Sequence, residues 1–78
     1  MRKPFLIRVD WDDQARVWTA DSDDVPGLAT EADTVEALNH KLREMIPELL
    51  ALNGVPVSGD IAYELLIRRF DSISADAA

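Results

Sequence analysis

The sequence predicts a small α+β domain in which an antiparallel sheet, with elements in the order β-β-β-α-β, carries one long helix on one face. Two patterns predict this class. Apolar residues alternate with polar ones near both ends of the chain, as in half-buried strands, and they recur at helical spacing over residues 35–52. The chain has 78 residues, which suffices for one small core. We place a single domain at residues 1–70 and a flexible tail at residues 71–78.

The first predicted strand carries four apolar side chains on one face: Phe5, Ile7, Val9 and Trp11. A polar loop over residues 12–15 leads into a second strand. Pairing Trp11 with Arg16 sets Val9 opposite Trp18, so that the apolar faces of the two strands coincide. We therefore expect Trp18 in the core, whereas Trp11, at the strand end, fits either the core or an anchor for a partner.

A tight turn follows the second strand. Pro26 fixes its own φ and Gly27 can adopt a positive φ without a Cβ clash, so residues 25–28 fit a type II turn. Residues 28–31 form a short segment with a β-branched side chain at Thr30, which predicts a third strand. The chain therefore bends sharply between its second and third strands.

A helix is predicted from about Thr34. The Asp33 side chain can accept hydrogen bonds from the backbone N–H groups of the first turn. Glu36 can accept one from the backbone N–H of Asp33, in the manner of a capping box. Pro47 predicts a kink or a break, but the apolar stripe continues past it, which favours a kinked helix that stops at Gly54 in a left-handed conformation. Seven residues make up that stripe: Val35, Leu38, Leu42, Met45, Ile46, Leu49 and Leu52.

The last predicted strand spans residues 61–70 and is partly apolar on both faces. One face carries Leu66 and Phe70. Either this strand is buried on both sides at a homodimer interface, or these two side chains are ordinary surface apolars. We expect a homodimer that buries Leu66 and Phe70, because a small core without disulfides gains stability from association.

The acidic residues are unevenly distributed along the chain. The net charge is −7, and residues 10–36 hold nine acids with Arg16 as the only base. A negative field repels phosphate backbones and attracts basic surfaces, so we expect a basic protein as the partner and no binding to nucleic acid by the chain alone. Ordinary solubility is the alternative explanation of the same acids.

The composition argues against several classes of protein. There is no cysteine, which excludes thiol catalysis and thiolate metal sites and fits the cytoplasm. No apolar run reaches the roughly 20 residues of a membrane span. His40 has no serine, cysteine or second histidine in a catalytic pattern, and the carboxylates lack the spacing of a calcium loop. We therefore expect no enzyme, no catalytic residue, no metal site, no cofactor and no membrane association.

The chain resembles the HicB-like antitoxins around its Pro-Gly turn and helix start, where Thr30 and an acidic residue precede Asp33-Thr34 and Glu36-Ala37-Leu38. Chains of that family read strand, strand, Asp-x-Pro-Gly, strand, Asp-Thr-x-x-Glu-Ala, helix, strand, and this order runs here from about Phe5 to Phe70. The resemblance implies a partial ribonuclease-H-like fold. It also implies an antitoxin that binds and neutralises a small basic ribonuclease toxin of the HicA type.

The acids around the Pro-Gly turn are the expected contact for such a basic partner: Asp23, Asp24 and Glu31, with Trp11 as an aromatic anchor. We expect them near the exposed edge of the third strand, where a partner meets both backbone groups and charge. The alternative function is a stand-alone homo-oligomeric interaction module without a toxin partner.

Overall fold

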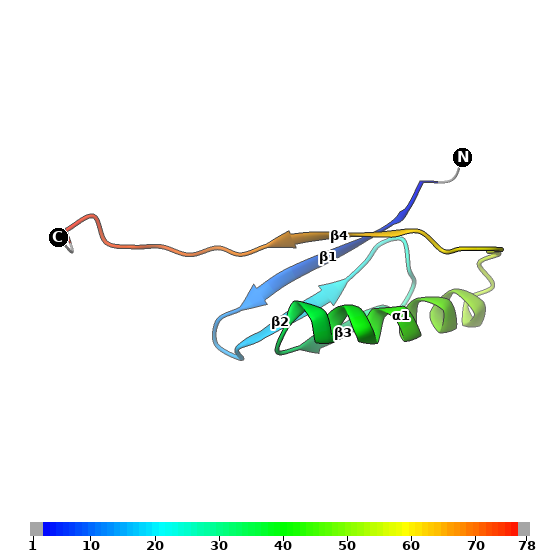
Figure 1. The fold of residues 1–78 in the computed structure, drawn as a ribbon, viewed down its shortest axis with the longest axis horizontal. Helices are drawn as coiled ribbons and strands as arrows, with labels where there is room; N and C mark the ends of the chain where they lie inside the picture. The colour runs from blue at the N-terminus through cyan, green and yellow to red at the C-terminus, as the bar shows by residue number, and fades with distance from the viewer. Residues whose placement is uncertain (1–2, 77–78) are drawn as a thin grey trace.

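The computed structural model describes residues 3–76, and Figure 1 shows one sheet with a single helix beside it. The predicted α+β class, with one long helix on one face of the sheet, is confirmed. The strands lie in the order β3-β2-β1-β4 across the sheet. The elements are β1 (Phe5–Asp12), β2 (Val17–Asp21), β3 (Ala29–Ala32), α1 (Val35–Leu52) and β4 (Tyr63–Arg68).

The sheet is mixed, so the prediction of an antiparallel sheet was wrong. The β1–β2 and β2–β3 pairs are antiparallel, but β4 pairs in parallel with β1. The cause is the helix, which carries the chain back along the sheet after β3. As a result, β4 starts at the same end of the sheet as β1 and adds to the free edge of β1, as in a crossover connection. Alternating apolar residues show which side a strand buries but not its direction.

The register of the first hairpin also differs from the prediction. The structure pairs Trp11 with Trp18 and Asp12 with Val17, whereas Trp11 had been expected opposite Arg16. Arg16 lies in the loop with a φ of 60°, and its N–H donates to the carbonyl of Asp12 at 2.8 Å. The slip is two residues, so every side chain keeps its face, and the hydrophobic pattern is satisfied equally well by both registers.

The predicted type II turn is confirmed. Gly27 has a φ of 79°, and the N–H of Leu28 donates to the carbonyl of Val25 at 3.2 Å. Both flanking apolar residues are buried. The turn therefore directs Val25 and Leu28 into the core while its Pro-Gly tip stays outside.

The N-cap and the start of the helix each lie one residue later than predicted. Thr34 is the N-cap, with an extended backbone, and its Oγ1 accepts the N–H of Ala37 at 3.0 Å. Asp33 is therefore not the cap, and Glu36 is not in the capping-box position, although it lies in the first turn, where a negative charge suits the helix dipole. Aspartate and threonine are both good caps, so the local sequence permits either start.

The helix runs through Pro47 without a break, as favoured from its apolar stripe. It stops where predicted. Gly54 has a φ of 69°, its N–H donates to the carbonyl of Ala51 at 3.2 Å, and the N–H of Val55 donates to the carbonyl of Leu50 at 2.9 Å. These two bonds form a Schellman motif, which satisfies the last carbonyls of the helix.

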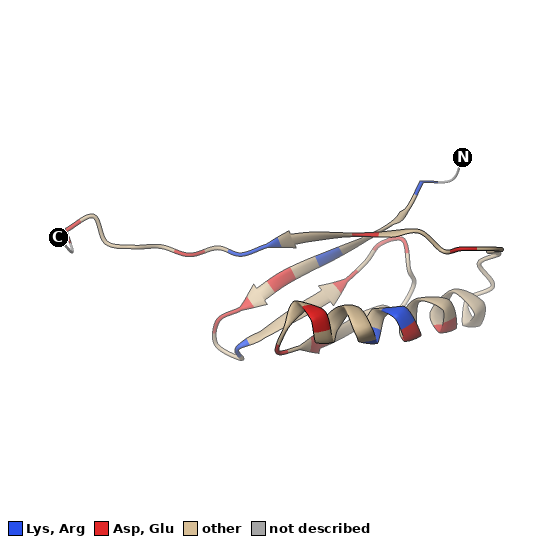
Figure 2. Cartoon of the chain, in the orientation of Figure 1, with Lys and Arg blue, Asp and Glu red and all other residues tan. Residues whose placement is uncertain are grey.

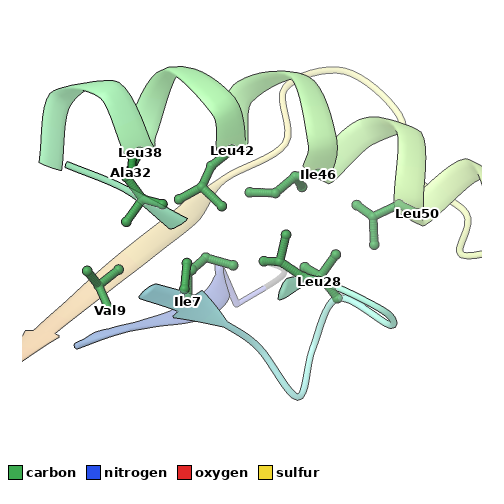
Figure 3. Packing of buried hydrophobic residues seen from close by; sticks show 10 residues of the cluster. Ile7, Val9, Leu28, Ala32, Leu38, Leu42, Ile46 and Leu50 are labelled. Carbon is green, nitrogen blue, oxygen red and sulfur yellow. The ribbon is translucent and has the colours of Figure 1, made fainter. Parts of the chain in front are cut away.

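The core lies between α1 and one face of the sheet (Figure 3). Four helix residues are fully buried: Leu38, Leu42, Ile46 and Leu50. Leu52, predicted on the buried stripe, is 81% exposed instead. Successive buried positions are four residues apart, so the contact line drifts around the helix and ends at Leu50. The other face of the sheet is not covered by α1.

Candidate functional site: the open face of the sheet

Alternate residues of all four strands point away from α1 and form the surface that we call the open face. Its members follow from the strand registers: Leu6, Arg8, Asp10 and Asp12 of β1, Val17, Thr19 and Asp21 of β2, Ala29 and Glu31 of β3, and Glu64, Leu66 and Arg68 of β4. Within residues 3–76, no helix packs on this face. The open face is therefore an array of side chains at the regular spacing of a sheet.

Carboxylates dominate the charge of the open face. It carries five acids, and Arg8 and Arg68 are its only bases. Figure 2 shows acidic positions along β1 and β2 and in the loops that join the strands. The five acids are Asp10, Asp12, Asp21, Glu31 and Glu64. A surface of this composition favours contact with a basic partner.

Arg8 holds two acids at the end of the open face. Its Nε donates to Asp21 Oδ1 at 2.7 Å, and its Nη1 and Nη2 donate to the two carboxylate oxygens of Asp23 at 2.8 and 3.3 Å. The hydrogen bonds from Arg8, together with its positive charge, hold the pKa of Asp23 below its usual range. The same pairs raise the pKa of the Arg8 guanidinium, and its hydrogen bonds engage Nε, Nη1 and Nη2 with these two acids.

We expect the Asp23 carboxyl to titrate below the usual aspartate pKa in the wild type and close to it in Arg8→Gln. A depressed folded-state pKa adds stability that is present above the unfolded-state pKa and is lost as the pH falls through the folded-state pKa. Carboxyl carbon chemical shifts, followed by NMR through acid pH, measure the midpoint. Identical midpoints in the two proteins would show that Arg8 does not act on Asp23.

The loop after β2 extends the β1–β2 pairing with side chains. Ser22 Oγ donates to the carbonyl of Leu6 at 2.6 Å, and Asp24 Oδ2 accepts the N–H of Leu6 at 2.8 Å. Ser22 Oγ also accepts the N–H groups of Asp24 and Val25 at 3.0 and 3.2 Å. Asp24, predicted as a partner contact, is thus engaged in holding β1. Ser22 was missed by sequence reasoning, although a serine two residues before an aspartate is a turn signal.

Trp11 lies on the opposite side of the sheet from the acids. Its ring centroid is 5.1 Å from the ring centroid of Trp18. The guanidinium carbons of Arg69 and Arg16 lie 4.6 and 5.0 Å from the Trp11 centroid. Its Nε1 donates to Asp13 Oδ1 at 3.2 Å. The indole is therefore half-buried and contacts two cations. Of the four predicted partner-binding residues, Glu31 lies on the open face and Asp23 lies beside it, bound to Arg8, whereas Trp11 lies on the other side of the sheet.

The remaining predicted residues lie at the two edges of the sheet. Glu31 is on the edge strand β3, and its carbonyl accepts a hydrogen bond from Lys41 Nζ at 2.6 Å. Leu66 lies on β4 and is 50% exposed. Phe70 is 90% exposed and lies beyond β4, because the strand ends at Arg68 and is shorter than predicted. The structure thus leaves both predicted dimer residues uncovered at one edge.

The hollows of the surface are shallow. A hollow of about 450 Å³ lies beside the loop that follows α1, and the only ionisable residues in its lining are Lys3 and Asp60. Among residues 3–76, no group of three or more histidines and carboxylates is placed to hold a metal ion. His40 Nε2 lies 3.9 Å from Glu44 Oε1 on the outer surface of the helix. In the described part of the chain, no helix is long and apolar enough to cross a membrane.

Comparison with known proteins identifies a matching family and a similar crystal structure. A family model described as "Domain of unknown function (DUF1902)" matches residues 4–73. The fold is similar to the crystal structure of hypothetical protein TTHA1013 from the extremely thermophilic bacterium Thermus thermophilus. The two chains share 44% sequence identity with a TM-score of 0.73, and the match covers 92% of this chain and 99% of that one. None of the curated proteins matches the sequence.

Proposed function

We propose that this chain, which belongs to the DUF1902 family, is a HicB-like antitoxin that uses its open face to bind and neutralise a small basic ribonuclease toxin of the HicA type. The observation that carries this proposal is the uncovered, acidic face of the sheet. The resemblance of the Pro-Gly turn and helix start to the HicB-like antitoxins supplies the class of partner.

An acidic sheet suits the neutralisation of a ribonuclease for a physical reason. A ribonuclease binds RNA with basic side chains that contact phosphates, and carboxylates at regular spacing compete for the same basic groups. The carboxylates also accelerate encounter, because their field extends beyond contact distance. Asp10 and Asp21 remain 42% and 55% exposed although Arg68 and Arg8 contact them, so a partner can reach their free oxygens.

The proposal requires that a small basic protein is encoded by the adjacent reading frame, and the test measures association of this chain with that protein. Asp23→Lys/Glu31→Lys reverses one charge on the open face and one beside it, and neither side chain holds the backbone of β1 as Asp24 does. We expect the on-rate at low salt to fall on the order of 10-fold and its salt dependence to flatten. Surface plasmon resonance at two salt concentrations gives both quantities.

A matched control separates the open face from net charge. Glu44→Lys/Glu48→Lys makes the same change in net charge on exposed positions of α1. We expect its on-rate to stay within about 3-fold of the wild type, because the helix surface faces away from the partner and distant charges are screened. Equal losses for the two variants would exclude the open face as the binding surface, and a wild-type chain that does not bind the basic protein would exclude the toxin partner.

A second candidate function is a stand-alone homo-oligomeric interaction module. The observation that favours it is the exposure of apolar side chains at one edge of the sheet, where Leu66 and Phe70 are 50% and 90% exposed. This function requires no basic partner. It predicts self-association of the purified chain and no change in mass when the neighbouring basic protein is added.

A further inference from the structure

The two edges of the sheet are protected to different degrees. The edge strand β3 has only four residues, and Lys41 caps the carbonyl of Glu31 on it. The edge strand β4 has six residues, with an apolar run at Leu65, Leu66 and Ile67, and side chains on both of its faces are exposed. A long, apolar edge is a template for another strand, and proteins normally cover or charge such an edge. The edge of β4 therefore needs an occupant.

We propose that the occupant is a second copy of this chain, whose β4 pairs antiparallel with the first around a two-fold axis at Leu66. The pairing is independent of the basic partner proposed above. It joins the two four-stranded sheets into one continuous sheet. The argument comes from the direction of the backbone groups of β4 and from the charges that each register brings together.

The backbone of β4 presents alternate residues to the free edge. The N–H of Phe5 donates to the carbonyl of Ala62 at 2.9 Å, so the even-numbered residues of β4 direct their backbone groups toward β1. Tyr63, Leu65 and Ile67 consequently direct their N–H and C=O groups outward. In an antiparallel pair these outward groups exchange hydrogen bonds, and Leu66 lies in the non-hydrogen-bonded position, where side chains approach most closely.

Charge selects the register. Side chains of directly opposed residues must lie on the same face of the joined sheet. The allowed registers therefore differ by two residues, which moves the two-fold axis by one residue along β4. With Leu66 opposite its own copy, Glu64 lies opposite the partner's Arg68 at both ends of the interface, and Leu65 lies opposite the partner's Ile67. Shifting the axis to Leu65 or Ile67 sets Leu66 opposite Glu64 or Arg68 and removes both ion pairs. The Leu66 register is the one in which the strand is complementary to itself.

This arrangement also fixes how the open faces meet. A two-fold axis perpendicular to the sheet leaves both helices on one side and both open faces on the other. Leu66 of each copy then covers the other in the middle of the joined face. The acids of β1 and β2 flank this contact on both sides, so the dimer doubles the acidic surface without placing it in the interface.

The first test uses two charge reversals that are complementary only across this register. Glu64→Arg alone brings arginines together at both ends of the interface, and Arg68→Glu alone brings glutamates together, so each variant is expected to dissociate at least about 10-fold more readily than the wild type. Mixed together, the two variants restore both ion pairs in a heterodimer. Sedimentation equilibrium should show about 8.7 kDa for each variant and twice that mass for the mixture.

The mixing experiment also controls for effects within one chain. Arg68 contacts Asp10 of its own chain at 3.3 Å, so Arg68→Glu perturbs the monomer as well, and circular dichroism checks that it folds. Changes within one chain cannot be reversed by adding the other variant. A mixture that stays at the monomer mass, or a wild-type chain that is monomeric at high micromolar concentration, would overturn the proposal.

The second test uses a single thiol in a chain that has no cysteine. Opposed non-hydrogen-bonded residues have Cα atoms about 4.5 Å apart, within the range of about 4.4–6.8 Å that a disulfide spans. Leu66→Cys should therefore form a covalent dimer under mild oxidation. Leu52→Cys, at an 81% exposed position at the end of α1, should cross-link only through random collision. Equal cross-linking of the two variants would refute the register.

Discussion

Replacing Leu42 with alanine is expected to lower the free energy of unfolding by about 2–5 kcal/mol. Leu42 is fully buried between α1 and the sheet, so truncation removes apolar contacts and leaves a cavity. A domain of this length has a total stability of roughly 4–12 kcal/mol, so the variant loses a large share of it. Urea denaturation, followed by the fluorescence of Trp11 and Trp18, measures the change.

Leu52→Ala is the matched control for Leu42→Ala. The same substitution is made on the same helix, and both residues belong to the apolar stripe of the sequence, but Leu52 is 81% exposed. We expect its stability to stay within about 0.5 kcal/mol of the wild type. If Leu52→Ala were as destabilising as Leu42→Ala, the buried side of the helix would have been assigned incorrectly.

Replacing Ser22 with alanine is expected to cost about 1–3 kcal/mol of stability. Its single hydroxyl donates to the carbonyl of Leu6 and accepts the N–H groups of Asp24 and Val25, so three backbone groups lose their partner together. The Asp24 carboxylate also loses the turn that aims it at the N–H of Leu6. Urea denaturation gives the total cost, and amide hydrogen exchange at Leu6 shows whether the end of β1 is released.

The control for Ser22→Ala is Ser72→Ala in the exposed segment after β4. It removes the same hydroxyl outside the sheet and should change stability by less than about 0.5 kcal/mol. Unchanged exchange at Leu6 in Ser22→Ala would mean that water replaces the hydroxyl and that the side chains of the loop do not extend the strand pairing.

Three errors in the sequence-based prediction fall where the local sequence permits two alternatives. Asp33 and Thr34 are both competent caps, and the structure uses Thr34. Two registers of the first hairpin satisfy the same hydrophobic pattern, and only the geometry of the loop at Arg16 separates them. The last buried position of the helix is a third case. Leu50 and Leu52 are equally apolar, but the line of contact with the sheet drifts around the helix and buries only Leu50.

Only part of the arrangement around the open face could be anticipated from sequence. The excess of acids is a property of composition, and the sequence alone shows that Asp23 and Glu31 belong to it. The engagement of Asp24 with the backbone of β1 could not be anticipated, since its contact with Leu6 joins residues 18 positions apart. Nor could the sequence separate Trp11 from the acids, because the side of the sheet on which each lies depends on how the elements assemble.

By itself, the sequence determined what short-range forces control: which residues alternate between faces and where Gly27 and Gly54 permit positive φ. It favoured one helix through Pro47 but left a break open, and the structure shows the continuous helix. Only the tertiary structure decided the direction of β4, the sheet face that stays open and the edge that stays bare. Periodicity and backbone sterics act over a few residues and are written in the local pattern. Strand order and direction depend on the free energy of packing the whole helix across the sheet, which no local segment contains.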